Sequence, residues 1–278
     1  MEFALYNNVK TFYGDVFDVL MGDEAKNMII LGNLIIGYEG KDTFGWRDPA
    51  NWVMATVSDG GEVRLVALMT PPYNITMYAT DEAAVKCLAD GLVSRKIPVP
   101  GVVAEKSLAQ AFALAYCSAK NMTHSITYSQ RIYELRAVNP DVPKIGRFRA
   151  SSEQDLSFLP YWTEDFSNGK VGENIEPYRY HVSLGKLYVL EHDGMAVSIA
   201  KITREMANSV GIGFVYTPPY LRGRGYASSV VAHISQLCLD RGFMSCILYT
   251  DLANPTSNSI YQKIGYMPIC DSLEIAFS

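Results

Sequence analysis

Residues 215–228 read Val-Tyr-Thr-Pro-Pro-Tyr-Leu-Arg-Gly-Arg-Gly-Tyr-Ala-Ser, and they are the most informative segment of the sequence. An apolar strand ends here, a proline-rich bend follows, and a glycine-punctuated loop opens directly into a long helix. Gly223 and Gly225 lack a Cβ atom, so a bulky anion can approach the backbone closely. The start of the helix adds unpaired amide N–H groups and the positive end of the helix dipole. With Arg222 and Arg224 beside it, the loop is predicted to hold a diphosphate.

Other phosphate-binding loops fit this stretch less well. In the dinucleotide fingerprint Gly-x-Gly-x-x-Gly, the third glycine is replaced here by Ser228. The Gly-Lys-Ser/Thr end of a P-loop is missing. Because a Gly-x-Gly pair before a helix also occurs as a plain turn, a second motif downstream has to decide between the two interpretations.

The segments around the loop predict an α/β domain. Residues 226–240 have apolar side chains at i, i+3, i+4, i+7, i+10 and i+11, which gives a helix with one buried stripe. Residues 243–250 are apolar on both faces, which is typical of a strand covered on both sides. Asn254 is the expected N-cap of a helix at residues 255–264. The remaining elements are expected as strands at 148–150, 187–191, 195–202 and 210–217, helices at 153–166 and 175–184, and strands at 266–268 and 273–277 that close the sheet.

The first half predicts the same order of elements. Helices are expected at 9–21, 24–36, 81–95 and 107–120, and strands at 52–57, 62–68, 75–79, 101–104 and 125–138. Residues 138–144 contain two prolines and are the predicted domain boundary. The fold class is therefore α/β (α+β), with two domains in tandem, residues 1–139 and residues 146–278. Each is expected to be a mixed, mostly antiparallel sheet flanked by helices.

The second motif is at residues 251–266 and, together with the loop, it resembles the GNAT superfamily of acyl-CoA N-acyltransferases. The family's acyl-CoA loop, Arg/Gln-x-x-Gly-x-Gly/Ala, is matched by Arg-Gly-Arg-Gly-Tyr-Ala at 222–227. The family's Asn-(x)6-Tyr-x-x-x-Gly-Phe/Tyr is matched from Asn254 through Tyr261 to Gly265 and Tyr266. The resemblance covers residues 146–278 and implies acetyl-CoA as cosubstrate.

The resemblance also implies roles for individual residues. The end of the third strand is expected to part from its neighbour and bind the pantetheine amides, and Asn254 to lie beside the pantetheine arm. The implied cofactor-binding residues are Val215, Tyr216, Thr217, Arg222, Gly223, Arg224, Gly225, Tyr226, Ala227, Ser228 and Asn254. Tyr261 is the implied catalytic residue, because its phenol can protonate the departing thiolate as a general acid. Packing of Tyr261 in the core is the alternative interpretation.

The general base stays unassigned. The strands expected at 210–217 and 243–250 contain no acid. Glu191, Glu205 and Asp251 are close in the sequence, and His181 and His192 are equally ambiguous. A water chain, or a substrate bound as the free amine, can serve instead.

The first half lacks the acyl-CoA loop. Asp81 and Glu82 stand where the corresponding helix begins, and their charges would repel a pyrophosphate. We interpret residues 1–139 as a degenerate GNAT-like domain that walls one side of the acceptor cleft.

Composition limits the partners. Hydrophobic residues make up 49% and charged residues 19% of the 278 residues, and the net charge of −5 leaves neither half basic, so no nucleic acid is expected. A signal peptide is missing and the most apolar run, residues 28–38, is too short to span a bilayer, so no membrane contact and a cytoplasmic location are expected. The five cysteines match no zinc motif and are interpreted as reduced core residues, without a metal.

The predicted function is transfer of an acetyl group from acetyl-CoA to an amine, either a small molecule or a peptide, by direct attack. Two alternatives stay open. One is a non-catalytic acyl-CoA-binding or regulatory module. The other is an aminoacyl transferase of the tandem-GNAT type, which should lack an intact CoA loop and carry a basic groove.

Overall fold

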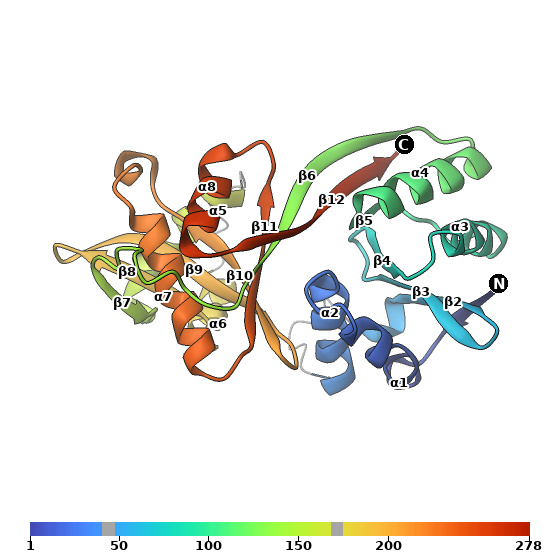
Figure 1. Ribbon diagram of the computed structural model, residues 1–278, viewed down its shortest axis with the longest axis horizontal. Coiled ribbons are helices and arrows are strands. Elements are labelled where there is room, and N and C mark those ends of the chain that lie inside the picture. The colour runs from blue at the N-terminus through green and yellow to red at the C-terminus, as the bar shows by residue number, and fades with distance from the viewer. Residues whose placement is uncertain (41–47, 168–174) are drawn as a thin grey trace. The chain divides into compact units, whose positions relative to one another are not determined.

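The computed structural model describes residues 1–40, 48–167 and 175–278, and the chain folds into two compact units (Figure 1). Unit 1 comprises Met1–Ile132, Thr250–Ala253 and Ile269–Ser278. Unit 2 comprises Tyr133–Tyr249 and Asn254–Pro268. Neither unit is one continuous stretch of sequence.

Unit 1 is built on a mixed sheet with the strand order β1-β2-β3-β4-β5-β12-β6. Strands β4 and β5 run parallel, whereas the pairs β1–β2, β2–β3, β3–β4 and β5–β12 are antiparallel. Helices α3 and α4 cover one face of the sheet and α1 and α2 cover the other (Figure 1). The strands are β1 (Glu2–Tyr6), β2 (Val53–Asp59), β3 (Glu62–Met69), β4 (Ile75–Ala79), β5 (Gly101–Glu105), β6 (His124–Leu135) and β12 (Met267–Phe277). The helices are α1 (Val9–Met21), α2 (Met28–Glu39), α3 (Ala84–Ser94) and α4 (Lys106–Lys120), with a short 3-10 turn at Pro49–Asn51.

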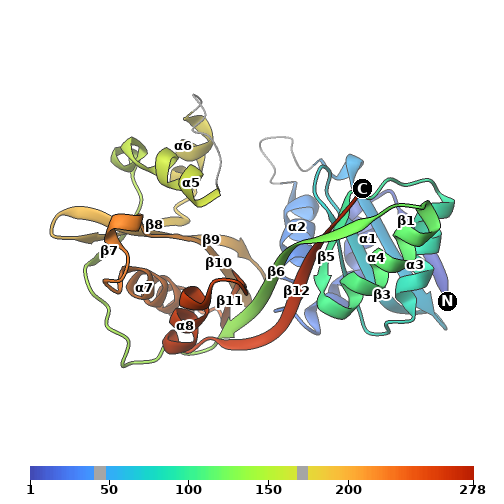
Figure 2. The ribbon, with the colours of Figure 1, turned by 90° about the horizontal axis from the view of Figure 1, so that it is seen from above.

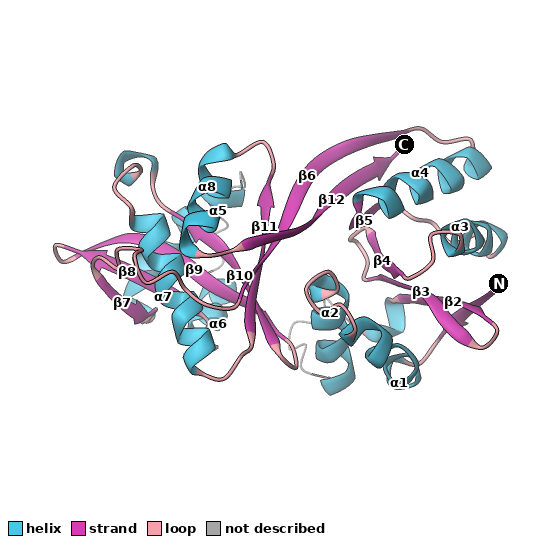
Figure 3. Cartoon of the chain, viewed as in Figure 1, coloured by secondary structure: helices cyan, strands magenta, loops and turns pink. Residues whose placement is uncertain are grey.

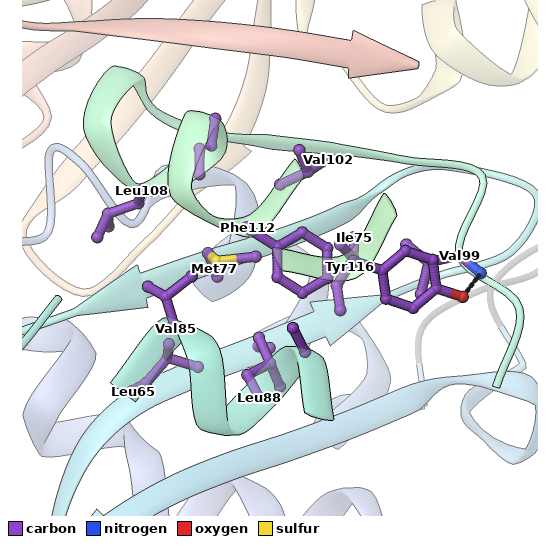
Figure 4. Close-up of a cluster of buried hydrophobic side chains, with 14 of the residues drawn as sticks. Leu65, Ile75, Met77, Val85, Leu88, Val99, Val102, Leu108, Phe112 and Tyr116 are labelled. Atoms are coloured by element: carbon purple, nitrogen blue, oxygen red, sulfur yellow. Dashed lines mark hydrogen bonds between the residues drawn. The ribbon is translucent and has the colours of Figure 1, made fainter. Parts of the chain in front are cut away.

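The core beneath α3 and α4 is apolar, as Figure 4 shows. Side chains of β3, β4 and β5 pack there against Val85 and Leu88 of α3 and against Phe112 of α4. Tyr116 of α4 is 1% exposed, and its hydroxyl donates to the carbonyl of Ile97 (2.8 Å) and accepts from the amide of Val99 (3.2 Å). The one polar end of this aromatic side chain is therefore satisfied inside the core.

Unit 2 has the strand order β11-β10-β9-β8-β7. Helices α7 and α8 lie on one face of this sheet and α5 and α6 on the other (Figure 2). Alternate residues of β8 face the two layers: Tyr188 and Leu190 pack with α7, and Leu187 and Val189 pack with α5. The strands are β7 (Arg147–Ala150), β8 (Leu187–His192), β9 (Met195–Glu205), β10 (Ser209–Tyr216) and β11 (Ser245–Asp251). The helices are α5 (Leu159–Ser167), α6 (Glu176–Ser183), α7 (Tyr226–Asp240) and α8 (Pro255–Ile264), with 3-10 turns at Glu153–Ser157 and Pro219–Leu221.

Several local predictions are confirmed. Both α7 and α8 have the predicted bounds, and Asn254 caps α8 by accepting from the amide of Ser257 (3.0 Å). The turn between β8 and β9 places Asp193 at φ +50° and Gly194 at φ +76°. Two successive positive φ values give the turn that matches strand twist in a tight hairpin, as the Asp-Gly pair predicts.

The last strand is a correction. Residues 273–277 were expected to close the sheet of the C-terminal half, and this is wrong. They belong to one continuous strand, β12, whose Ser272–Ala276 pair antiparallel with Glu105–Gly101 of β5 in unit 1. Leu273 and Ile275 are 3% and 1% exposed in the core of unit 1. Conversely, Tyr133 and Leu135 at the end of β6 are fully buried in unit 2. The observed units therefore differ from a simple division into residues 1–139 and 146–278.

Smaller differences concern the ends of elements. Strand β1 was not predicted, because its exposed residues show no clear apolar alternation. The helix expected at 24–36 begins only at Met28. The helix expected at 153–166 is a 3-10 turn followed by α5, with a break at Phe158.

The predicted fold class, a mixed sheet flanked by helices, is confirmed (Figure 3). All five cysteines are free thiols; Cys117, Cys238 and Cys246 are buried, and Cys87 and Cys270 are half-buried. Within residues 1–40, 48–167 and 175–278, none of the helices combines the length and hydropathy needed to cross a bilayer.

Candidate functional site

Strands β10 and β11 of unit 2 part from each other halfway along. Their parallel pairing runs from Ser209–Ser245 to Gly211–Ile247, although β10 continues to Tyr216 and β11 to Asp251. Backbone groups of β10 beyond Gly211 therefore lie outside the ladder with β11, and buried backbone groups require partners. This end of β10 includes Val215 and Tyr216, two of the predicted cofactor-binding residues.

The pairing of β10 with β9 is irregular at the same place. Its register with β9 shifts between Gly213 and Tyr216, and Phe214 has φ +57°. A positive φ is uncommon for a bulky residue, so the surrounding structure must hold it. The ring of Phe214 lies 4.6 Å, centroid to centroid, from that of Phe166 on α5. Bulges are common beside functional sites, where they redirect the chain.

The residues after β10 are braced by hydrogen bonds. The hydroxyl of Ser198 donates to the carbonyl of Tyr216 (2.9 Å) and lies 2.9 Å from the hydroxyl of Thr217. The guanidinium Nε of Arg222 donates back to the carbonyl of Thr217 (3.0 Å). The bend between β10 and the glycine loop is therefore held from both sides.

The glycine loop has the backbone shape that its sequence predicts. Gly223 has φ +77° with nothing within 4 Å of where a Cβ would lie, and Gly225 has φ +82°. Gly225 is the N-cap of α7 and provides no side-chain cap, and the first turn contains no acidic residue. The first intrahelical bond runs from the amide of Ser229 to the carbonyl of Gly225 (3.0 Å). The amides of the preceding helical residues thus have no intrahelical acceptor, at a site that favours anions.

The predicted loop residues differ in exposure. Arg222, Gly223, Arg224 and Gly225 are exposed, Ala227 and Ser228 are half-buried, and the side chain of Tyr226 is buried. The ring of Tyr226 packs beside that of His192, with 5.4 Å between centroids. Its side chain therefore anchors α7 in the core, and its backbone amide belongs to the exposed start of the helix.

Tyr261 is set in α8, which packs against α7. It is 9% exposed, and its ring packs against those of Tyr133 (6.4 Å between centroids) and Tyr266 (5.9 Å). Over the described parts of the chain, its hydroxyl makes no hydrogen bond. Burial raises the pKa of Tyr261 to about 12, so the phenol stays protonated at neutral pH. The ring is fixed while the hydroxyl remains available as a donor.

The side chain of Tyr216 has a partner that sequence reasoning did not identify. Its hydroxyl donates to the carboxylate of Asp165 on α5. Burial, and then the hydrogen bond and charge of Asp165, raise the pKa of Tyr216 to about 12. Asp165 lies 51 residues earlier in the chain, and no local pattern links the two positions. The backbone of Tyr216 lies where β10 and β11 part, and its side chain connects β10 with α5.

The acids considered as general bases already form hydrogen bonds or ion pairs with other groups. Glu191 accepts from Arg149 (2.7 Å), Glu205 pairs with Lys186 (2.5 Å), and Asp251 accepts from the amide of Ala253 (2.8 Å). His192 is half-buried, and its Nε2 lies 3.7 Å from the carboxylate of Asp193. His181 lies 3.0 Å from the ammonium of Lys201, and burial, followed by that charge, lowers the pKa of His181 to about 4. His181 is therefore neutral at pH 7, and it remains an unassigned candidate.

The corresponding place in unit 1 has the opposite electrostatics. Strands β4 and β5 also pair only briefly, through Ile75–Val102 and Thr76–Val103. Ahead of α3, the carboxylate of Asp81 accepts from the amide of Ala83 (2.9 Å). An acid therefore lies just ahead of this helix, although its first turn contains none, and a carboxylate there disfavours an anion. In the part of the chain that the structure describes, no group of three or more His, Cys, Asp or Glu residues is arranged to hold a metal ion.

Comparison with known proteins extends these observations. Residues 193–274 match the family model described as FR47-like protein. A GNAT-family acetyltransferase from Colwellia psychrerythraea is similar over 100% of this chain and 99% of its own, with 11% identity and a TM-score of 0.59. A GCN5-related N-acetyltransferase from Sphaerobacter thermophilus covers 99% of this chain and 95% of its own, with 14% identity and a TM-score of 0.61.

A Drosophila protein solved by a structural genomics consortium is similar over 99% of this chain and 98% of its own, with 11% identity and a TM-score of 0.68. No curated protein matches the sequence. The solved GNAT-family structures span the whole chain, so they confirm the predicted fold class; at these identities they establish the fold alone.

Proposed function

We propose that this chain, which has the fold of GNAT acetyltransferases, is an N-acyltransferase that moves an acetyl group from acetyl-CoA to an amine. The observation that carries the proposal is Tyr261, whose ring packs against two buried tyrosines and whose protonated hydroxyl has no partner among the described residues. A phenolic hydroxyl left free at the end of a fixed ring is available to donate a hydrogen bond to a bound ligand. The acceptor is a small-molecule or peptide amine.

The cosubstrate is assigned to unit 2. The backbone of Val215, Tyr216 and Thr217 would pair with the pantetheine amides where β10 and β11 part. The loop from Arg222 through Gly223, Arg224 and Gly225, and the amides of Tyr226, Ala227 and Ser228, would hold the pyrophosphate. Asn254 would lie beside the pantetheine arm while it caps α8.

The chemistry asked of Tyr261 is a single proton transfer. The amine nitrogen forms a bond to the thioester carbonyl carbon, and the carbon–sulfur bond breaks. Tyr261 donates its phenolic proton to the departing sulfur. It is then reprotonated either by solvent or by the proton that the amine loses. Such a group typically contributes about 10²–10⁴ in rate. Because the pKa of Tyr261 is about 12, the donor form is present throughout the physiological range.

The test is thiol release from acetyl-CoA with a panel of amines: polyamines, amino acids, amino-containing antibiotics and peptides with a free N-terminus or lysine. Turnover that depends on both acetyl-CoA and one class of amine, and that falls in Tyr261→Phe, is the expected result. Binding of CoA without turnover on any amine would instead identify a binding module. No CoA binding at all would exclude the assignment of the loop.

Unit 1 is proposed not to form a second cofactor site. Calorimetric titration of the full chain with CoA is expected to give one site per chain. Two sites per chain would contradict the reading of Asp81 and Glu82 as charges that exclude a pyrophosphate.

A further inference from the structure

Tyr133 connects the last residues of β6 with the helix that bears Tyr261. It is fully buried in unit 2, at 0% exposure. Its hydroxyl donates to the side-chain oxygen of Asn258 (3.1 Å) and accepts from the side-chain amide of Gln262 (3.3 Å). Both partners are on α8, one turn apart. A single buried hydroxyl therefore forms hydrogen bonds with side chains on two successive turns of this helix.

The hydrogen bonds continue to the start of α8. The side-chain amide of Asn258 donates to the carbonyl of Asn254 (2.8 Å), and the backbone amide of Asn258 donates to the same carbonyl (3.2 Å). Asn254, Asn258 and Gln262 are spaced by four residues and so form one row along the helix. Tyr133 thus connects with the N-cap through Asn258, and with the residue that follows Tyr261 through Gln262.

The ring of Tyr133 also packs on Tyr261 itself. Their centroids are 6.4 Å apart with an interplanar angle of 52°, a favourable tilted geometry. Helix α8 has only ten residues, and a helix of this length is marginal in water without tertiary support. The contacts from Tyr133 are therefore in a position to decide where the hydroxyl of Tyr261 lies.

We infer that Tyr133 is a positioning residue for the proposed general acid, holding α8 so that the phenol of Tyr261 stays directed at the thioester sulfur. This inference rests on the proposed function. It makes the end of the first half of the sequence part of the catalytic apparatus of unit 2. Tyr133 does not touch substrate; it acts through Tyr261.

The alternative is that Tyr133 is an ordinary buried tyrosine, and the chain supplies a matched control. Tyr116 in unit 1 is likewise buried, and its hydroxyl likewise makes one donated and one accepted hydrogen bond. Tyr133→Phe and Tyr116→Phe remove the same atom from similar surroundings. Both should lower the melting temperature, so stability alone does not separate a positioning role from a structural one.

The test is a double-mutant cycle in the full chain, with acetyl-CoA turnover as the readout. Tyr133→Phe is expected to lower kcat by about 10-fold, within the range seen when a catalytic group is misplaced, with the KM for acetyl-CoA changed by less than about 3-fold. Tyr116→Phe should leave both constants unchanged. In a Tyr261→Phe background, Tyr133→Phe should cause no further loss of kcat, because the group that it positions is gone. Gln262→Ala is a change at the surface that removes one of the two hydrogen bonds to the Tyr133 hydroxyl. It should lower kcat by a smaller factor than Tyr133→Phe does.

Three outcomes would overturn the inference. Tyr133→Phe could retain the parent kcat, it could lower kcat equally in the Tyr261→Phe background, or Tyr116→Phe could lower kcat as much. In each case Tyr261→Phe still loses activity, so the proposed function stands. Absence of acetyl-CoA turnover by the parent protein would overturn the proposed function and, with it, the role given to Tyr133.

Discussion

The hydroxyl of Tyr216, at the end of β10, donates a hydrogen bond to the carboxylate of Asp165 on α5. Tyr216 is 6% exposed and packs in the cluster formed by Leu159, Val189 and Ile199. The same residue presents its backbone where β10 and β11 part. The strand end that we propose for cofactor binding is thus clamped to the helix layer on that face of the sheet.

Removing this clamp should affect stability more than cofactor binding. A hydrogen bond to a charged group is typically worth about 1.5–3 kcal/mol, so Tyr216→Phe and Asp165→Asn should each lower the free energy of unfolding by up to about that amount. The double variant should be little worse than either single one, because both remove the same interaction. Denaturant melts measure the three values. Additive losses would contradict a direct Tyr216–Asp165 bond.

Gly225→Val should abolish the increase in melting temperature that acetyl-CoA produces by mass action. The new side chain has room in the folded chain, since the nearest atom, Cδ1 of Ile145, is 3.9 Å from the Cβ position. It would occupy the path of the phosphates and force a β-branched residue into φ +82°. Gly194→Val is the control, because Gly194 has φ +76° with open space around it, in the β8–β9 turn. Full CoA affinity in the Gly225 variant would refute the loop assignment.

Tyr261→Phe should lower kcat by about 10²–10⁴ at neutral pH and change the KM for acetyl-CoA by less than a few-fold. Because the pKa of Tyr261 is raised to about 12, the parent should show no alkaline decline from this group below about pH 10. A thiolate can leave unprotonated more readily at high pH, so the deficit of the variant should shrink as pH rises. Turnover equal to that of the parent, with chemistry shown to limit the rate, would reduce Tyr261 to a packing residue.

His181 should make the protein less stable in mild acid. Its pKa in the folded state is lowered to about 4 by burial and by the charge of Lys201, whereas an unfolded histidine titrates near 6.5. The unfolded state therefore binds more protons between these values, and the contribution of neutral His181, complete above the unfolded pKa, is lost as pH falls toward about 4. The melting temperature of His181→Gln should decline less than that of the parent over this window. Parallel curves would show that His181 titrates normally.

Ile275→Ala should destabilise unit 1, although Ile275 is close to the C-terminus. Its side chain is 1% exposed in the core that includes α3 and α4, and truncation of a buried isoleucine costs about 2–5 kcal/mol. Hydrogen exchange should increase first in β2–β5 of unit 1. Ile126→Ala on β6 is the control, because Ile126 is 53% exposed. Loss of protection confined to unit 2 would contradict the pairing of β12 with β5.

Elements whose determinants lie within a few residues of each other were predictable from the sequence. Helices α7 and α8 have the expected bounds because an apolar stripe, an N-cap at Asn254 and glycines at the right places act over one or two turns. The turn at Asp193 and Gly194 and the positive φ values of Gly223 and Gly225 are local for the same reason. The loop and the position of Tyr261 in α8 therefore needed no tertiary information.

The pairings between residues that are distant in the sequence could be known only from the folded structure. A strand with alternating apolar residues, such as β12, can pair with any sheet edge of matching register. Nothing in the sequence near residues 267–277 specifies that its partner is β5, about 170 residues earlier. The burial of Tyr133 against α8 and the bond from Tyr216 to Asp165 have the same character. Hydrophobic burial has no direction, so the choice among compatible partners is made by packing of the whole chain and leaves no local signal in the sequence.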